Sequence, residues 1–240
     1  MRVFLFAIFV GALTLSAGSA YFFFGQKKDD PLVAELFRYR QQVDAVLPKA
    51  KTGDVKAQFA LAGVLKRANP AFRDEEKALF WFRKAADQGH VEAQFRVGEM
   101  YAAGEGAARN YHRASEWFQL AAGLGNHPGA QFALGDLYFH GRGVPHSYGR
   151  AINLYRKAAH KGHPVARHVL GLMYKEGWGV DLDLVEAFKW FSLAIPRAAA
   201  LRVWKPPYDP VKEREKLLKI MNRSQVDRAE RLVKAWKGRK

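Results

Sequence analysis

The chain has 240 residues, no cysteine and a formal net charge of +16 at pH 7. Without cysteine, disulfides, thiolate metal ligands and cysteine nucleophiles are all excluded. The charge is uneven, because residues 197–240 contain 14 Lys and Arg against 5 Asp and Glu, or +9, and the other 196 residues carry +7. Such a basic C-terminal part is either a solvated helical surface or a site for an anionic partner.

An apolar segment begins the chain. From Val3 to Phe24 there is no charged residue, and a helix of this length spans about 33 Å, enough for a hydrocarbon layer of about 30 Å. We predict a signal anchor or a signal peptide over residues 1–26. Cleavage would follow the small residues 18–20, but it would leave the four aromatic residues 21–24 exposed at the new terminus. This favours the retained anchor.

The charges around this segment leave its orientation open. Lys27, Lys28, Arg38 and Arg40 follow it and only Arg2 precedes it, which by the positive-inside rule keeps the rest of the chain in the cytoplasm. A single basic residue followed at once by an apolar run is instead the layout of an export signal. We favour export: a cell-membrane protein anchored by residues 3–24, or alternatively a cleaved and secreted one.

A capping helix is predicted over residues 27–52. Asp30 followed by Pro31 is a good helix start, because proline at the first helical position lacks only an N–H that would be unpaired anyway. Apolar residues then fall on or near one helical face. We expect this helix to cover the open end of the repeats that come after it.

Three sets of positions recur at intervals of 36, 37 and 36 residues. They are Ala57, Ala93, Ala130 and Ala166; Ala78, Ala114, Ala151 and Ala187; and Trp81, Trp117, Leu154 and Trp190. A fixed period of this length is typical of a solenoid, in which each unit is too small to bury its own apolar face. We predict four repeats within residues 53–196, with bounds 53–89, 90–125, 126–162 and 163–196.

Each repeat is predicted to contain two antiparallel helices, A and B. In the second repeat, the core stripe of helix A is Ala93, Val97, Gly98 and Tyr101, and its small residues allow helix B to approach closely. Helix B should begin at a residue of N-cap type and end before a glycine with positive φ. The N-cap positions are Asp74, Asn110, Ser147 and Asp183; the glycines of the A–B turns include Gly141, Gly143, Gly177 and Gly179; the C-cap glycines are Gly89, Gly125 and Gly162.

The combined pattern is Ala-x4-Gly-x2-Tyr-x2-Gly-x-Gly-Val, then Asp or Asn, Ala-x2-Trp and Ala-Ala-x2-Gly. It resembles the Sel-one-like repeat, a short relative of the tetratricopeptide repeat, over residues 53–195. The resemblance implies an all-α, right-handed superhelical solenoid of antiparallel helix pairs. The first repeat departs from the pattern at 68–70, where the glycine turn is missing, and the fourth runs into Pro196 in place of its last glycine motif.

After the repeats, residues 197–240 are predicted to form a basic helical pair. The sequence Lys-Pro-Pro-Tyr-Asp-Pro at 205–210 is typical of a stiff linker. The first helix then covers Val211 to Met221. The second begins with a capping box at residues 222–225 and runs to about Trp236.

No pattern in the sequence indicates catalysis. No serine or threonine lies in a nucleophile signature, and no cysteine exists to replace one. The acidic pair Asp181 and Asp183 is better explained by the N-terminus of a helix. We therefore predict a non-enzymatic protein, with no catalytic residues and no cofactor.

Three histidines raise the question of a metal site. His160, His163 and His168 are close in sequence, but Gly162 and Pro164 separate their directions. His127 and His163 occupy one repeat position, each directly before a proline, which favours a structural role in the turn. The Gly-x-Gly turns follow no strand and complete no phosphate-binding fingerprint. We predict neither a metal site nor a phosphate site.

The resemblance implies a scaffold in which the A helices form a concave groove for a peptide, a helix or a domain. Candidate partner-binding residues lie on helix A outside the core stripe: Phe59, Phe95, Phe132 and His168 at one repeat position, and Glu99 and Asp136 at another. Aromatic and charged groups together can supply apolar anchors and a polar rim. The alternative is that the phenylalanines only pack between neighbouring helices.

We therefore predict a protein–protein interaction scaffold or adaptor of a bacterial cell envelope, with its repeats in the periplasm. The alternative hypothesis is that the basic C-terminal region binds an anionic polymer or lipid headgroups, with the repeats as a spacer. Nucleic acid is a weaker variant, because it requires the cytoplasmic orientation.

Overall fold

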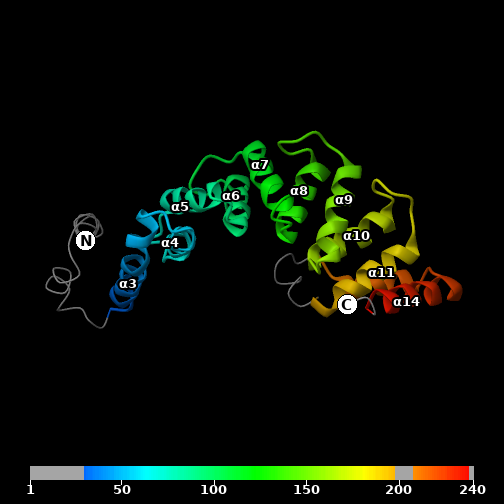
Figure 1. The fold of residues 1–240 in the computed structure, drawn as a ribbon. Coiled ribbons are helices and arrows are strands. Elements are labelled where there is room, and N and C mark those ends of the chain that lie inside the picture. The colour runs from blue at the N-terminus through cyan, green and yellow to red at the C-terminus, as the bar shows by residue number, and fades with distance from the viewer. Residues whose placement is uncertain (1–29, 198–207, 238–240) are drawn as a thin grey trace. The chain divides into compact units, whose positions relative to one another are not determined.

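The computed structural model describes residues 30–197 and 208–237. These residues form eleven α-helices and one 3₁₀ helix and no strand (Figure 1). The all-α solenoid class is therefore confirmed. The signal anchor or signal peptide over residues 1–26 lies outside the described residues, as do residues 205–207 of the predicted linker. Within the described ranges, none of the helices combines the length and apolarity needed to cross a bilayer.

Contacts divide the chain into two units, one ending at Trp81 and one beginning at Phe82. The first unit contains α3 (Pro31–Lys51), α4 (Val55–Arg67) and the first part of α5 (Glu75–Asp87). As predicted, Asp30 caps α3, because its Oδ1 accepts a hydrogen bond of 2.8 Å from the Leu32 N–H. Helix α3 packs against α4.

The first repeat has a different A–B connection from the others, as its missing glycines indicated. Asn69 donates a side-chain hydrogen bond of 2.9 Å to Glu35 of α3. The ring of Phe72 lies 5.0 Å from the ring of Tyr39, also on α3. Contacts with α3 therefore fix this loop in the absence of a glycine turn.

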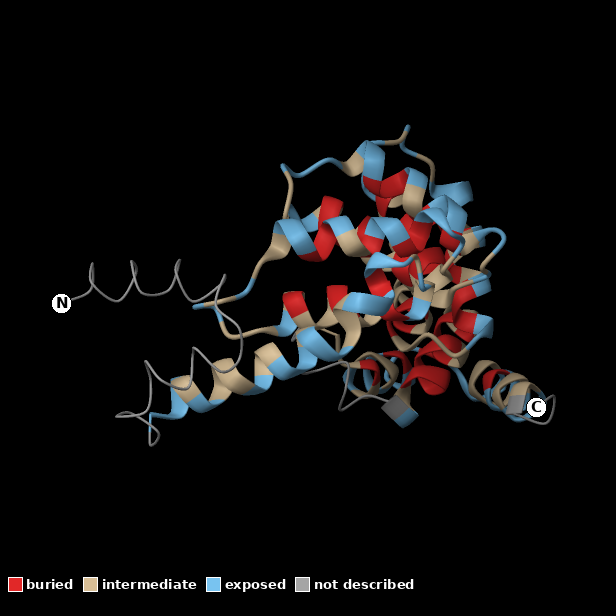
Figure 2. Cartoon of the chain, turned by 60° about the vertical axis from the view of Figure 1, so that its left-hand side comes forward, coloured by how far each residue is buried: buried red, intermediate tan, exposed pale blue. Residues whose placement is uncertain are grey.

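In the second unit, helices pack in pairs along the chain. The pairs are α6 (Val91–Ala103) with α7 (Tyr111–Ala122), α8 (Pro128–His140) with α9 (Tyr148–His160), and α10 (Pro164–Glu176) with α11 (Leu184–Ala194). Buried residues, red in Figure 2, lie mainly where these helices face each other. Each pair buries one apolar face against the next, as the repeat pattern predicted.

The small residues of helix A are needed for this close packing. The predicted core stripe of α6, including Ala93 and Val97, is buried. A Cβ added at Gly98 would lie 2.5 Å from the ring of Phe118 on α7, and one at Gly171 would lie 2.5 Å from the ring of Phe191 on α11. Since real Cβ contacts are longer, helices A and B can approach this closely only at glycine.

The N-caps of the B helices are confirmed. The side-chain oxygens of Asp74, Asn110, Ser147 and Asp183 accept hydrogen bonds from backbone N–H groups in the first turn of α5, α7, α9 and α11, at distances of 2.8 to 3.3 Å. The four helix starts expected from the sequence therefore have the predicted side-chain partner.

One of the three C-cap glycines differs from the prediction. Gly89 and Gly162 have φ of 84° and 86°, as expected, but after α7 the positive φ of 50° belongs to Asn126 and not to Gly125. The spacing explains this: the repeated alanines are 16 residues apart from Ala114 to Ala130, and 15 apart at the other B-to-A connections. Gly125 is instead required for close packing, because a Cβ there would lie 2.4 Å from Val91.

The C-terminal pair belongs to the same unit. After the 3₁₀ helix η1 (Ile195–Arg197) come α13 (Pro210–Leu218) and α14 (Arg223–Lys237). The predicted capping box is confirmed. The backbone N–H of Asn222 donates to Oε1 of Gln225 at 2.9 Å, and the backbone N–H of Gln225 donates to Oδ1 of Asn222 at 3.0 Å. The first helix ends at Leu218, three residues earlier than predicted. Both helices pack against α11.

Candidate partner-binding surface

The candidate surface is formed by the outward sides of the A helices α6, α8 and α10, which all lie in the second unit. Phe59 lies on α4 in the first unit, where it is half-buried. It is therefore described separately, and its role in partner binding stays a prediction.

Histidines begin all three A helices of this surface. His90, His127 and His163 are the N-caps of α6, α8 and α10, and each Nδ1 accepts a backbone N–H at 3.1 to 3.2 Å. A ring that accepts at Nδ1 carries its neutral-form proton at Nε2. The structural role predicted for His127 and His163 is confirmed.

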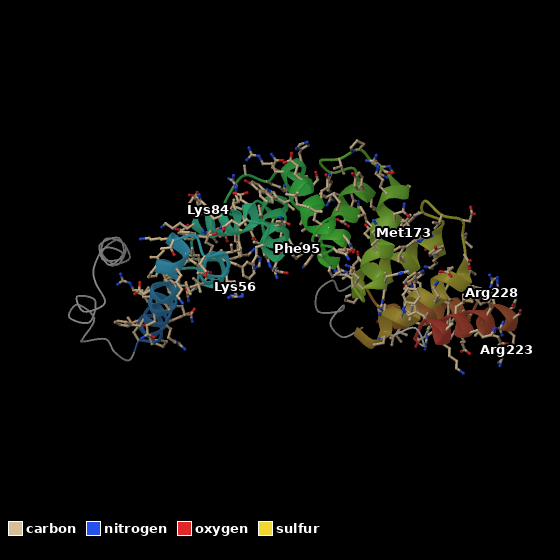
Figure 3. All side chains as sticks on the ribbon, in the orientation of Figure 1. Lys56, Lys84, Phe95, Met173, Arg223 and Arg228 are labelled. Atoms are coloured by element: carbon tan, nitrogen blue, oxygen red, sulfur yellow. The ribbon has the colours of Figure 1, made fainter. Side chains whose placement is uncertain are left out.

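The capping histidines of α8 and α10 also contact an aromatic ring of the preceding A helix. The rings of His127 and Phe95 lie 4.5 Å apart, and those of His163 and Phe132 lie 4.8 Å apart at an interplanar angle of 18°. Phe132 also contacts Tyr155 and is only 7% exposed. Phe132 is therefore part of the core between neighbouring helices, which corrects its assignment as a partner contact. Phe95 remains half-buried on α6 (Figure 3).

A charged cluster surrounds Phe95. The Arg96 guanidinium lies between Glu92 and Glu99, with N–O distances of 2.8 Å to each, and 5.4 Å above the Phe95 ring. The Nε2–H of His127 donates to Glu92 at 3.0 Å. This hydrogen bond, together with the Arg96 charge, holds the pKa of Glu92 below its usual range. Glu92 and Arg96 are not among the residues predicted from the sequence, although their spacing from Glu99 places all three on one side of α6.

On α8, Asp136 lies at the same repeat position as Glu99. Its side chain is 33% exposed, and its Oδ1 lies 3.6 Å from Nε2 of His140. Burial, and then the negative charge of Asp136, raise the pKa of Tyr208. Tyr208 precedes α13 in the sequence, and its ring lies 4.8 Å from that of His168 on α10, so the C-terminal segment reaches the A-helix side of the stack.

The corresponding surface of α10 is covered by this segment. His168 is 1% exposed, and its ring lies 4.8 Å from Tyr208 and 5.3 Å from Phe191. Its burial lowers its pKa to about 4. Lys175 of α10 pairs with Glu213 of α13 at 3.1 Å. His168 is therefore a core residue and not an accessible partner contact, which corrects the sequence-based assignment.

The sequence carries a signal for this covering that was missed. His127 and His163 each cap an A helix whose first residue is proline, and Asp209 caps α13, which begins at Pro210 in the same way. Helix α13 thus starts like the A helix of a further repeat. The ring of Tyr208, one residue before the cap, contacts His168, as the capping histidines contact the preceding phenylalanines.

The three histidines considered for a metal serve different structural roles. The ring of His160 packs edge-on against Trp236 at 4.5 Å, His163 caps α10, and His168 lies beneath Tyr208. In the part of the chain that the structure describes, no three His, Asp or Glu side chains are grouped as metal ligands would be.

Known proteins share both the repeat and the fold. The family model of the Sel1 repeat matches residues 55–90, 91–126, 128–163 and 164–195. A protective antigen present in uropathogenic Escherichia coli strains, displaying an SLR fold, aligns at a TM-score of 0.69 and 28% identity, over 90% of this chain and 44% of that one. A Sel1 repeat protein from Oxalobacter formigenes aligns at a TM-score of 0.61 and 26% identity, over 78% of this chain and 75% of that one. The chain thus spans less than half of the first relative. No curated protein matched the chain.

Proposed function

The chain belongs to the Sel1 repeat family, and we propose that it is a non-enzymatic adaptor of a bacterial cell envelope. Sel1 repeats are generally protein–protein interaction scaffolds. Both solved relatives come from bacteria, and the uncharged run from Val3 to Phe24 supports attachment to a membrane. The repeats then hold a protein partner in the periplasm.

The partner binds the outward side of α6 and α8, around Phe95, Arg96, Glu99 and Asp136. The observation that carries this assignment is the difference between A helices. The surface of α10 is covered by Tyr208 and α13, whereas the charged cluster of α6 remains a third or more exposed.

The chemistry of this surface defines the partner. Glu92, Glu99 and Asp136 give it three carboxylates against the single guanidinium of Arg96, although the whole chain is strongly basic. Phe95 supplies an aromatic anchor in the same place. A segment with a basic side chain beside an apolar one would complement both features.

Site-specific crosslinking in native membranes tests this proposal. A photoreactive amino acid replaces Phe95 on α6 in the full chain, and a control chain carries it at Leu120, a 44% exposed residue of helix B α7. We expect one protein adduct from position 95 only, lost when Glu99→Lys reverses a charge. The same adducts from both positions, or no effect of Glu99→Lys, would contradict the assignment.

The envelope location has its own test. A C-terminal fusion to an enzyme that is active only outside the cytoplasm should be active, and a fusion to a protein that fluoresces only inside should be dark. The reverse result would place the repeats in the cytoplasm and reject the periplasmic part of the proposal.

A second candidate function rests on the surface of the C-terminal pair. Five basic residues of this pair are exposed and, among the described residues, take part in no ion pair: Lys212, Lys219, Arg228, Arg231 and Lys234. By contrast, Lys216 and Arg223 pair with Glu213 and Asp227. The apolar side of α14 packs into the core, so its basic side faces outward (Figure 3). Such a surface suits an anionic polymer or lipid headgroups.

Salt dependence tests this second function. The full chain should bind a soluble polyanion or vesicles of anionic lipid, with affinity falling steeply as salt rises. Replacing the five unpaired bases with glutamine should remove about 1 kcal/mol of binding free energy for each base near the anionic surface. Binding that is insensitive to both salt and these replacements would reject it.

A further inference from the structure

A cavity of about 390 Å³ lies among α11, η1, α13 and α14. Its lining residues are Phe188, Ser192, Ile195, Pro196, Arg214, Glu230, Val233 and Lys234. The volume lies in the range of small-ligand sites, roughly 300–1,000 Å³. The cavity therefore has room for a ligand of several heavy atoms.

Two polar atoms in the cavity wall have no hydrogen-bond partner among the described residues. Ser192 is 8% exposed, and neither its Oγ nor the buried Nε of Arg214 has a hydrogen-bond partner within the described ranges. The Arg214 guanidinium lies over the Phe188 ring at 5.7 Å. Leaving such groups unpaired costs about 1–3 kcal/mol each, and more for a charged group. A ligand that accepts hydrogen bonds from both would remove this cost once the two side chains turn these atoms towards the cavity.

The rest of the lining defines the other end of the ligand. The apolar walls are formed by Phe188, Ile195, Pro196 and Val233. An alkyl group of the ligand would bury its apolar surface against them. Among the ionisable residues, Arg214 and Lys234 are cationic and Glu230 is anionic. The balance of charge at the cavity is therefore positive, which favours an anionic ligand group.

We propose that this cavity binds a carboxylate carried by a short apolar group. The carboxylate lies against Arg214 and Ser192, because a guanidinium and a hydroxyl both donate to carboxylate oxygens. The apolar group lies against Phe188, Ile195 and Val233. Such a ligand is either a free short-chain fatty acid or the C-terminal residue of a peptide, and the site is independent of the surface on α6 and α8.

Calorimetric titration of the full chain in nanodiscs tests this with two pairs of probes. Hexanoate is compared with hexanamide, and N-acetyl-leucine with N-acetyl-leucinamide. We expect at least one carboxylate to bind about tenfold or more tightly than its amide, since a tenfold ratio needs only about 1.4 kcal/mol. If hexanoate binds more tightly than N-acetyl-leucine, the ligand is a free acid. If N-acetyl-leucine binds more tightly, the ligand is the C-terminal residue of a peptide. Equal binding of acid and amide, or no binding, overturns the proposal.

Variants then locate the binding. Arg214→Gln should weaken carboxylate binding about tenfold or more, and Val233→Trp should abolish it by filling the cavity. The matched control is Arg228→Gln, an exposed base of α14 outside the cavity lining (Figure 3). Equal loss in Arg214→Gln and Arg228→Gln would show nonspecific attraction to a basic surface and reject the site. If Arg214→Gln unfolds, the acid–amide comparison on the unaltered chain still decides.

Discussion

Helices α6 and α10 occupy equivalent places in their repeats, yet their outward surfaces differ. Phe95 of α6 is half-buried, and the charges beside it are partly exposed, whereas His168 of α10 is 1% exposed beneath Tyr208. The surfaces differ because a different kind of segment follows each of the two repeats. A further full repeat comes after that of α6 and supplies a capping histidine, but the C-terminal pair comes after that of α10 and covers it. Repeat position alone therefore does not decide which residues a partner can reach.

The largest expected effect comes from loosening the C-terminal pair. Leu217 of α13 is fully buried against a cluster that includes Phe188 and Phe191. Leu217→Ala should destabilise the chain by about 2–5 kcal/mol, because it removes buried surface and leaves a cavity. The midpoint of denaturant unfolding measures the loss, and hydrogen exchange at α10 measures its uncovering.

The adjacent leucine is the matched control. Leu218 is 43% exposed, so Leu218→Ala should change the unfolding free energy by no more than about 0.5 kcal/mol. If the two variants are equally stable, or if amides of α10 exchange no faster in Leu217→Ala, the C-terminal pair does not cover α10 in solution.

An intermediate effect is expected from pH. Burial, with a smaller contribution from the charge of His127, lowers the pKa of His163 from 6.5 to about 4. Burial also lowers that of His168 to about 4, although Glu213 and Asp209 oppose the shift. Between pH 6.5, the ordinary histidine pKa, and about pH 4, the unfolded chain binds more protons than the folded chain. Stability should therefore fall as the pH falls from about 6.5 towards 4, by on the order of 2 kcal/mol per histidine.

The substitution His163→Asn separates the cap from the titration. Asparagine is a good N-cap residue and takes up no proton in this range. Its unfolding free energy, measured from pH 7 to 4, should decline less steeply than that of the unaltered chain. An unchanged pH slope would show that His163 is not the group that titrates.

Local features of the fold could be predicted because their causes are local. The N-caps Asp74, Asn110, Ser147 and Asp183 each satisfy a backbone N–H three residues away or fewer, so sequence spacing was sufficient. The error at Gly125 has a local cause as well. One additional residue in that connection moves the positive φ to Asn126, and the 37-residue interval was its visible signal.

The candidate site was harder to predict, because accessibility depends on distant segments. Phe132 and His168 fit the pattern of exposed helix A positions, but they are buried by His163 and by Tyr208 respectively. His168 and Tyr208 are 40 residues apart in the sequence, outside any local pattern. The charged cluster was only partly found, since it requires the His127 ring of the next repeat to reach Glu92.

The smallest expected effect compares one cation on each surface. Arg96 of α6 is 42% exposed and pairs within its own helix, whereas Lys175 of α10 is 24% exposed and pairs with Glu213 of α13, which is 14% exposed. Exposed pairs contribute little, so Arg96→Ala should change the unfolding free energy by about 0.5 kcal/mol or less. Lys175→Ala should cost about 1 kcal/mol, because its pair joins two elements and is less solvated. If Arg96→Ala costs as much as Lys175→Ala in the same denaturant titration, the α6 cluster stabilises the fold to the same degree, and its charges are not a surface reserved for a partner.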